Sequence, residues 1–431
     1  MKDFFPIHDK PRQQRFKKGD VLVLFGELFN RGYANGLVEE AERNGLTVIR
    51  ATVGRRDAGG DLRALTAEEC ENVPKPFINV PLEAGFDLEK DNNGKSPNDY
   101  LAGVKLSEWQ SAAIPQESLE YSRARGRDRF RRNTKKFIEE LAGFITPGAH
   151  VHFAHLMAGG VPRCKIVMPL MNRVFKGTGD RFLDSKTFWE SGIGKLLQAN
   201  FHEVTAETFN ILVDESTALR EKITAQGGSV SYVAYGYHGT EIMIKNTYQW
   251  QSYAPYIQGW AKVALENYST AWSSKGVTCC VYNCPEILTN SSSIFQGVEI
   301  PLYNLIRALE KEAPTATVTA RVREECKSAL KPEATMTQVF DLVDGFLSSE
   351  LFLKTSVYAG WPQHSQKDQL EAALKTSDNI IALHKDEKSL MTATLSELVF
   401  KGCGYIMLHE AVKPAHPVAW IGHEAVAKSL I

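Results

Sequence analysis

The chain has 431 residues, of which 43% are hydrophobic and 10% aromatic, and its formal net charge at pH 7 is −1. A near-neutral chain of this length can bury a large core, and its charge gives no sign of a nucleic-acid partner. The first residues lack an apolar run long enough for a signal peptide, and no stretch approaches the ~18 apolar residues of a membrane span. We therefore expect a cytoplasmic globular protein.

The seven cysteines are odd in number, lie in apolar or helical contexts and include no CxxC pair. This usage predicts reduced thiols in the core. Cys279, Cys280 and Cys284 are close in sequence, but the first two alternate faces of a predicted strand and no histidine is near. We therefore predict no metal site.

Apolar strand-like runs alternate with helical stretches, which is typical of an α/β fold with a doubly wound parallel sheet. Residues 20–25 and 46–52 predict the first two strands, with a helix over 37–44 between them. In the first turn, Gly26 allows a sharp bend, and Gly32 and Gly36 let the backbone and helix approach a pyrophosphate. The spacing is not GxGxxG, so the prediction of a dinucleotide site depends on the flanking strand and helix.

Arginines follow the second strand. Arg50, Arg55 and Arg56 precede the first acid, Asp57. Guanidinium groups suit a ribose 2′-phosphate, whereas an acid at this place suits a free 2′-hydroxyl. The pattern favours NADPH over NADH; Asp57 leaves NADH open, and a solvated basic loop is the structural alternative.

Further elements follow in chain order. Residues 76–82 predict a third strand, 85–112 a polar surface excursion, and 118–144 a long helix with an arginine-rich middle. The arginines suit a solvated helix face, or docking of an acidic carrier protein or a phosphopantetheine-type ligand. Residues 150–156 predict a fourth strand. Ala158 and Gly159 follow it, and such small residues would let the chain pass close to a nicotinamide ribose.

His150 and His152 share one face of the fourth strand and His155 points to the other, so we expect buried histidines rather than metal ligands.

The second half carries the chemistry. A helix over about 205–226 leads to a strand over 227–239 that ends near Tyr237, and a later strand over 276–283 runs into a loop containing Thr289. Between them, Tyr253 and Lys262 stand nine residues apart at a helix start. A tyrosine hydroxyl can donate to a substrate oxygen as hydride arrives, and a lysine can lower the phenol pKa and bind ribose hydroxyls. A buried tyrosine and a snorkelling lysine are the structural alternative.

Together these motifs resemble the short-chain dehydrogenase/reductase superfamily, and within it the enoyl-thioester reductases of fatty-acid synthesis. The turn with Gly26, Gly32, Tyr33 and Gly36 is similar to theirs, although Gly32 stands where serine is usual. The spacing of Tyr253 and Lys262 resembles the larger bacterial trans-2-enoyl reductases. The resemblance covers about residues 19–310.

The resemblance implies a Rossmann-like NAD(P)-binding core over 1–310 and a mainly helical extension over 311–431. In that extension, we expect helices near 336–348 and 367–375, a last strand over the apolar residues 398–408, and a closing helix from His423 on the surface or on a subunit of a homo-oligomer.

The resemblance also implies an NADPH-preferring reductase that transfers hydride to a trans-2-enoyl thioester of acyl carrier protein or coenzyme A. Lys262 would hold the nicotinamide ribose, Tyr33 and Thr289 would lie against the cofactor, and Tyr253 and Tyr237 would stabilise the enolate oxygen. Tyr256 could take the role of Tyr253 by a small register shift. Reduction of a β-ketoacyl carbonyl, or a cofactor-binding regulator or scaffold without turnover, are the alternatives.

Overall fold

The structure is a computed structural model that describes residues 3–26, 32–252, 258–289 and 297–431. Within these ranges, eight strands form one sheet, and every neighbouring pair in it is parallel. From edge to edge the order is β1 (Pro6–Ile7), β12 (Val418–Ile421), β11 (Cys279–Asn283), β8 (Ser229–Gly236), β7 (His150–His155), β2 (Val21–Phe25), β3 (Thr47–Ala51) and β6 (Phe77–Ile78). This order confirms the predicted doubly wound α/β fold.

The direction of winding reverses between β2 and β7. From β2 the chain moves outward to β3 and β6, then returns to β7 and moves outward the other way through β8, β11 and β12. Ligands of open α/β sheets bind at the carboxyl ends of the strands beside such a reversal. Phe25 and His155, paired at the ends of β2 and β7, therefore mark the expected crevice.

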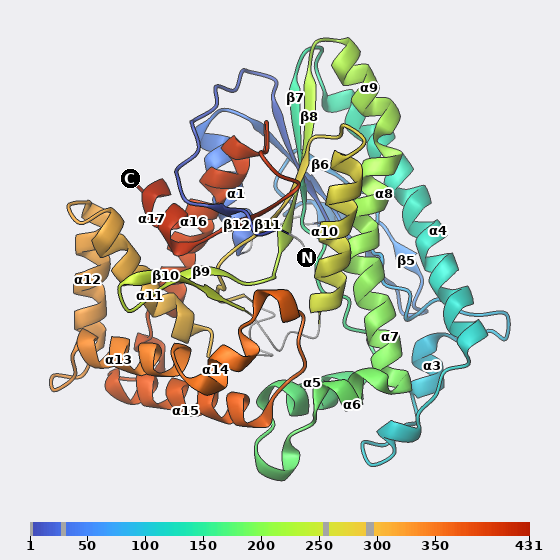
Figure 1. The fold of residues 1–431 in the computed structure, drawn as a ribbon. Helices are drawn as coiled ribbons and strands as arrows, with labels where there is room; N and C mark the ends of the chain where they lie inside the picture. Colours follow the sequence, from blue (N-terminus) through green and yellow to red (C-terminus); the bar gives the residue numbers. More distant parts are fainter. Residues whose placement is uncertain (1–2, 27–31, 253–257, 290–296) are drawn as a thin grey trace.

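Helices cover both faces of the sheet (Figure 1). On one face lie α1 (Tyr33–Arg43), α16 (Thr392–Glu410) and α17 (His423–Ser429), with α11 (Glu299–Glu312) beside them. On the other lie α4 (Gln116–Leu141), α8 (Thr208–Glu215) and α10 (Gly259–Ser273). Each layer buries its own apolar cluster against the sheet, which is why the strands read as near-continuous apolar runs. None of the described helices is both long and apolar enough to cross a bilayer.

Two further groups of helices lie below the sheet in Figure 1. One comprises α3 (Pro97–Leu101), α5 (Val167–Lys176), α6 (Ser185–Glu190) and α7 (Gly192–Phe201); the other comprises α12 (Thr317–Ala329), α13 (Met336–Leu347), α14 (Glu350–Thr355) and α15 (Lys367–Leu383). The smaller elements are α2 (Ala67–Cys70), α9 (Thr217–Ala225) and the hairpins of β4 (Arg55–Arg56) with β5 (Leu62–Arg63) and of β9 (Thr240–Ile244) with β10 (Thr247–Gln251).

Residues 85–112 are not only the surface excursion that we expected. Phe86, Leu101 and Trp109 are buried in an apolar cluster with α5, α6 and α7. The sequence did not predict their burial, because single apolar residues in a polar stretch show no helical or strand periodicity.

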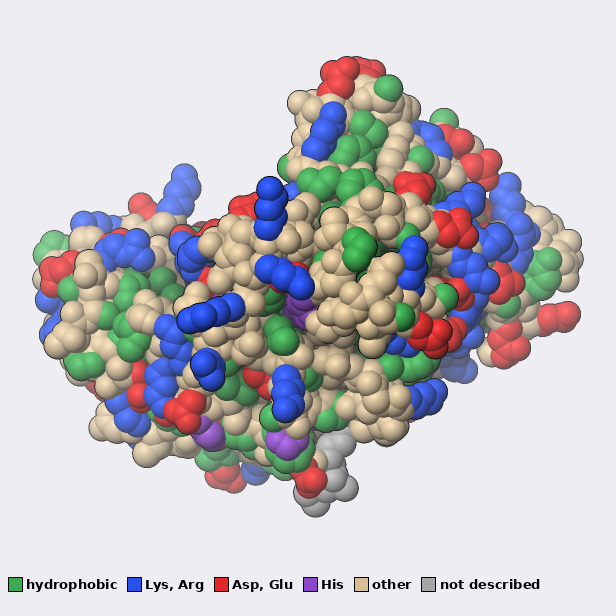
Figure 2. All heavy atoms as spheres, turned by 90° about the horizontal axis from the view of Figure 1, so that it is seen from above, with side chains coloured by type: hydrophobic (Ala, Val, Ile, Leu, Met, Phe, Trp, Pro, Cys, Tyr) green, Lys and Arg blue, Asp and Glu red, His purple; other side chains and the backbone are tan. Residues whose placement is uncertain are grey.

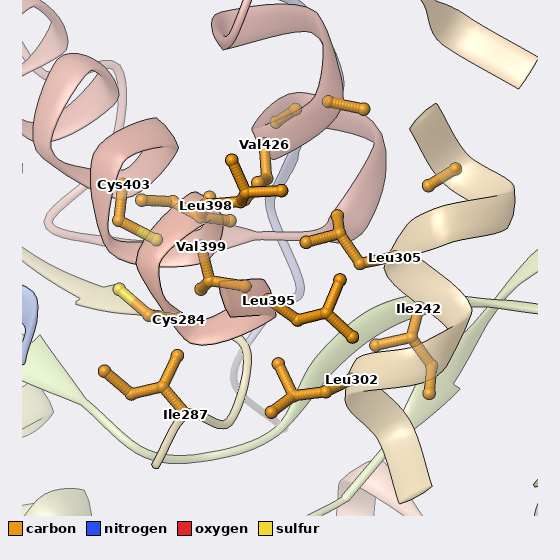
Figure 3. Packing of buried hydrophobic residues seen from close by; sticks show 14 of the residues in the cluster. Ile242, Cys284, Ile287, Leu302, Leu305, Leu395, Leu398, Val399, Cys403 and Val426 are labelled. Atoms are coloured by element: carbon orange, nitrogen blue, oxygen red, sulfur yellow. The ribbon is translucent and has the colours of Figure 1, made fainter. Parts of the chain in front are cut away.

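The last strand of the sheet is not at residues 398–408. That segment lies within helix α16, and the strand is β12, which pairs with β11 and β1. Figure 3 shows Leu395 of α16 between Leu302 and Leu305 of α11, and Leu398 and Val399 of the same helix belong to the same buried cluster. A helix buried on most of its surface reads as a continuous apolar run, which periodicity alone does not distinguish from a strand. The closing helix α17 starts at His423 as expected, but it is largely buried in the main cluster rather than on the surface.

The predicted division at residue 310 falls inside α11, and the chain beyond it returns α16 and β12 to the layers of the N-terminal strands. The organisation into two units, divided at residue 310, stays a prediction.

On the face seen in Figure 2, acidic and basic side chains are interspersed, as the near-zero net charge leads one to expect.

Helices α1 and α16 cross at two glycines. A Cβ added to Gly36 would lie 1.8 Å from the carbonyl oxygen of Phe400, and one added to Gly404 would lie 2.1 Å from the carbonyl carbon of Gly36. Gly36 thus packs against a helix backbone, whereas we had expected it to face the pyrophosphate.

We predict that Gly404→Ala lowers the free energy of unfolding by about 1 to 3 kcal/mol, because the added methyl group overpacks the crossing. Gly345→Ala is the matched control: this helical glycine is exposed and has nothing within 4 Å of an added Cβ. The control should gain about 0.5 to 1 kcal/mol through helix propensity. Denaturant unfolding measures both, and equal effects of the two substitutions would contradict the assignment.

Candidate functional site

The carboxyl ends of β2 and β7 frame a cavity of about 320 Å³. Its lining includes Gly26, Met157, Ala158 and Val53. Gly26 has φ of 93°, and a Cβ there would lie 2.3 Å from Cγ of Met157. Only glycine fits this turn, so the predicted sharp bend is present beside the expected ligand crevice.

The start of α1 meets the loop that follows β11. Gly32 has φ of 50°, and an added Cβ would lie 3.5 Å from both Ile287 Cδ1 and Thr289 Cγ2. Tyr33 donates its hydroxyl hydrogen to the carbonyl oxygen of Pro285 and stacks on Tyr235 with ring centres 5.2 Å apart. The structure therefore brings Gly32, Tyr33 and Thr289 together, although they are far apart in sequence.

The turn after β7 is tied to the start of α10. Gly159 has φ of 92°, and its carbonyl oxygen accepts hydrogen bonds from Thr205 at 3.2 Å and from Gln258 at 3.0 Å. Ala158 is exposed in the cavity lining. Both residues follow the carboxyl end of β7, where we expected a cofactor ribose.

The three arginines at the end of β3 and after it do not converge. Arg56 pairs with Glu83 at 2.7 Å and with Glu89 at 3.7 Å, and its side chain is 10% exposed. Arg50 is 7% exposed and lies 4.0 Å from Glu42, whereas Arg55 is exposed. Burial raises the pKa of Glu83, but the bonds and charges of Arg56 and Arg163 outweigh it, so the pKa lies below its usual value. Arg56 is thus committed to carboxylates of the protein itself.

Lys262 is buried on the first turn of α10, where its Nζ donates to the carbonyl oxygen of Tyr235 at 2.7 Å. Burial lowers its pKa to about 8, while the nearby Cys284 and Glu266 oppose this shift. An ammonium group has three N–H donors. Among the described residues one acceptor is present, which leaves donors for a ligand at the carboxyl end of β8.

One helical turn beyond Lys262, the buried carboxylate of Glu266 joins three elements. It lies 3.2 Å from Nδ1 of His238 and accepts from Nδ2 of Asn283 at 3.1 Å. Asn283 in turn accepts from the backbone N–H of His238 at 2.7 Å. The network fixes the ends of β8 and β11 against α10. Glu266 and Asn283 were not predicted from the sequence, because neither belongs to a recognisable motif.

Tyr237 lies at the carboxyl end of β8 and donates to Oε1 of Glu286 at 2.8 Å. Both side chains are half-buried. Burial raises the pKa of Glu286 to about 7; the bond from Tyr237 lowers it and the charge of Glu299 raises it. Glu286 was also missed, although its place between Pro285 and Ile287, in the loop expected to reach the cofactor, was an available signal.

Tyr253 and Tyr256 lie outside the described residues. Their roles therefore stay predictions. Of the residues on either side, Ser252 is buried and Gln258 is bonded to the turn at Gly159.

The arginine-rich part of α4 contacts carboxylates of the protein. Arg123 and Arg127 both pair with Glu203, and Arg131 pairs with Asp214 and Glu215. These arginines are therefore structural ion pairs, which differs from a freely solvated face.

The histidines of β7 have protein partners. His150 pairs with Ser229, His152 with Ser231 and His155 with Thr208, each at 2.8 Å. Within the described ranges, no group of three or more His, Cys, Asp or Glu residues could hold a metal ion.

This geometry fits a dinucleotide. The glycine turn at Gly26 and the small residues after β7 line one cavity. The start of α1 at Gly32 follows that turn in the chain, and Lys262 is bonded to the carboxyl end of the neighbouring strand β8. Hydrogen-bond donors at a helix start suit a pyrophosphate, and a buried ammonium suits ribose hydroxyls.

Comparison with known proteins agrees. Residues 3–430 match the family described as enoyl-acyl carrier protein reductase FabMG. A solved apo structure of FabMG, described as a novel type of enoyl-acyl carrier protein reductase, is 44% identical with a TM-score of 0.96, covering 100% of this chain and 98% of that one. An NADH-bound FabMG structure is 38% identical with a TM-score of 0.81, covering 100% and 99%. No match was found among curated proteins.

The match extends over almost the whole chain, including the C-terminal helices that the sequence motifs did not explain, and it confirms the resemblance to enoyl reductases. The chain belongs to the FabMG family of enoyl-acyl carrier protein reductases.

Proposed function

We propose that the protein reduces the carbon–carbon double bond of a trans-2-enoyl thioester carried by acyl carrier protein, and that NADH supplies the hydride. The observation that carries this proposal is the buried Lys262, which lies beside the Tyr237 strand end in the crevice where α/β sheets bind dinucleotides. A nicotinamide cofactor, when bound, supplies the hydride for the β-carbon.

The protein's own residues would then act on the other end of the conjugated system. Hydride addition places negative charge on the thioester oxygen, and hydroxyl donors preorganised around that oxygen stabilise it. We assign these donors to Tyr253 and Tyr237. Lys262 holds the nicotinamide ribose, and its positive charge in a buried environment favours the developing anion.

Two observations favour NADH. Arg56 is held by Glu83 and Glu89, so the arginine cluster that suggested NADPH is not assembled in this structure. A FabMG structure 38% identical to this chain was solved with NADH bound. NADPH remains the alternative, for which the exposed Arg55 is the available guanidinium.

Steady-state assays with crotonyl and dodecenoyl thioesters of acyl carrier protein test the function and the cofactor together. We expect higher kcat/KM with NADH than with NADPH. Arg56→Ala should lower thermal stability, because Glu83 and Glu89 lose a partner, without changing the ratio of the two cofactors. Higher kcat/KM with NADPH, reduced on Arg55→Ala, would instead support the NADPH alternative. Turnover of a β-ketoacyl thioester only would contradict enoyl reduction.

Lys262→Met should weaken cofactor binding and lower kcat together, because the methionine fills the buried space without ribose donors or charge. Titration of the apo protein with NADH measures the first effect. Lys401→Met is the control: Lys401 pairs with Glu397 on the surface of α16, and its loss should leave both quantities unchanged. Unaltered NADH affinity in Lys262→Met would show that Lys262 is only structural.

Tyr253→Phe should lower turnover by ~100-fold or more, which is in the range for loss of an acid or oxyanion donor. Tyr256→Phe should change it slightly, because it is Tyr253 whose spacing to Lys262 resembles that of the larger bacterial reductases. Cofactor affinity must be intact in both variants. The reverse ranking would assign the role to Tyr256.

A further inference from the structure

The hydroxyl group of Tyr237 is hydrogen-bonded to the carboxyl group of Glu286. The Tyr237 hydroxyl has one hydrogen, and in the structure it is donated to Glu286 at 2.8 Å. A hydroxyl that donates to a carboxylate has no hydrogen left for a substrate oxygen. If Glu286 is neutral, its own O–H can donate to the phenol oxygen, and the phenol hydrogen is released.

We propose that Glu286 is a positioning residue whose protonation directs the Tyr237 hydrogen, so that only neutral Glu286 lets Tyr237 donate to the thioester oxygen. This inference rests on the proposed function of Tyr237. No bond to the substrate is made by Glu286, and the proton it carries comes from water.

The surroundings of Glu286 favour the neutral form. Glu286 stands in the loop after β11. Among the described residues, the groups whose charge or hydrogen bonds act on it are Tyr237, at the end of β8, and Glu299, from the first turn of α11. Glu299 is itself buried and accepts a hydrogen bond from Ser377 of α15. Two carboxyl groups that share a buried region resist double ionisation, so Glu299 keeps Glu286 neutral at higher pH than burial alone would.

Another Tyr–Glu hydrogen bond, elsewhere in the fold, provides a comparison. Tyr248 of β10 donates to Glu312 at 2.9 Å, with the same chemistry but away from the crevice. It gives a control for the general effect of removing such a carboxyl group.

The sign of the pH effect follows from the pKa of about 7. Below pH 7 Glu286 is mostly neutral and does not hold the Tyr237 hydrogen. Above pH 7 the carboxylate accepts that hydrogen and turnover falls. At pH 8 about a tenth of the molecules keep neutral Glu286, since one pH unit is a tenfold change in the ratio of the two forms.

The experiment measures kcat of the parent, Glu286→Gln and Glu312→Gln with crotonyl-acyl carrier protein between pH 5.5 and about 9. Glutamine is neutral and can donate to the phenol oxygen, so it imitates protonated Glu286. We expect the rate of Glu286→Gln relative to the parent to rise about tenfold from pH 6 to pH 8. Because Lys262 is present in both the parent and Glu286→Gln, its titration affects both rates alike and cancels in their ratio.

Glu312→Gln should keep a constant ratio to the parent. Glu299→Gln should move the alkaline fall to lower pH, because removal of its negative charge makes Glu286 easier to ionise. Tyr237→Phe should abolish the fall assigned to Glu286. A ratio of Glu286→Gln to parent that does not change with pH would overturn the proposal.

A second readout needs neither substrate nor cofactor. Infrared difference spectra of the apo protein should contain a protonated carboxyl band that titrates near pH 7, is missing from Glu286→Gln and persists in Glu312→Gln. Absence of that band from the parent would overturn the proposal even if the enzyme turns over. A parent that shows the band but reduces no enoyl thioester would instead contradict the proposed function.

Discussion

The arrangement of the site depends on one buried carboxylate. Glu266 is fully buried, and it holds His238 at the end of β8 and Asn283 at the end of β11, one helical turn from Lys262. The pairing of parallel strands determines only where their carboxyl ends lie along the strand direction. The lateral position of α10 against those ends is set by these hydrogen bonds, and an unpaired carboxylate in such a place would be costly.

The same network explains how an ammonium group can be buried at the crevice. Moving a charge from water into the interior is unfavourable unless partners compensate for the lost hydration. Lys262 has the carbonyl oxygen of Tyr235 at 2.7 Å and the charge of Glu266 nearby, yet its pKa still falls to about 8. The protein therefore keeps Lys262 charged near neutral pH, with one hydrogen-bond acceptor among the described residues, and a charged ammonium group suits ribose hydroxyls.

Local pattern was sufficient to predict the first strand–helix–strand unit, because the apolar runs of β2 and β3 are short and end at glycine turns. It failed for α16 and β12, since a helix buried by α1, α11 and α17 keeps only a narrow polar face and the true strand has four residues. The spacing around Lys262 identified its helix, and Gly26 was recognisable from its turn. Gly36 was not, because the α16 backbone that it contacts lies more than 350 residues away in the chain.

Charged residues were the hardest to interpret from the sequence, because their roles depend on distant partners. Arg56 looked like a phosphate ligand until Glu83 and Glu89 were seen beside it, and the arginines of α4 looked solvated until Glu203 and Glu215 were. Glu286 showed the reverse: an acid that the sequence did not single out becomes chemically significant when folding places it against Tyr237. Most of these charged side chains thus form ion pairs that stabilise the framework. Lys262 and Glu286, at the crevice, instead have shifted pKa values.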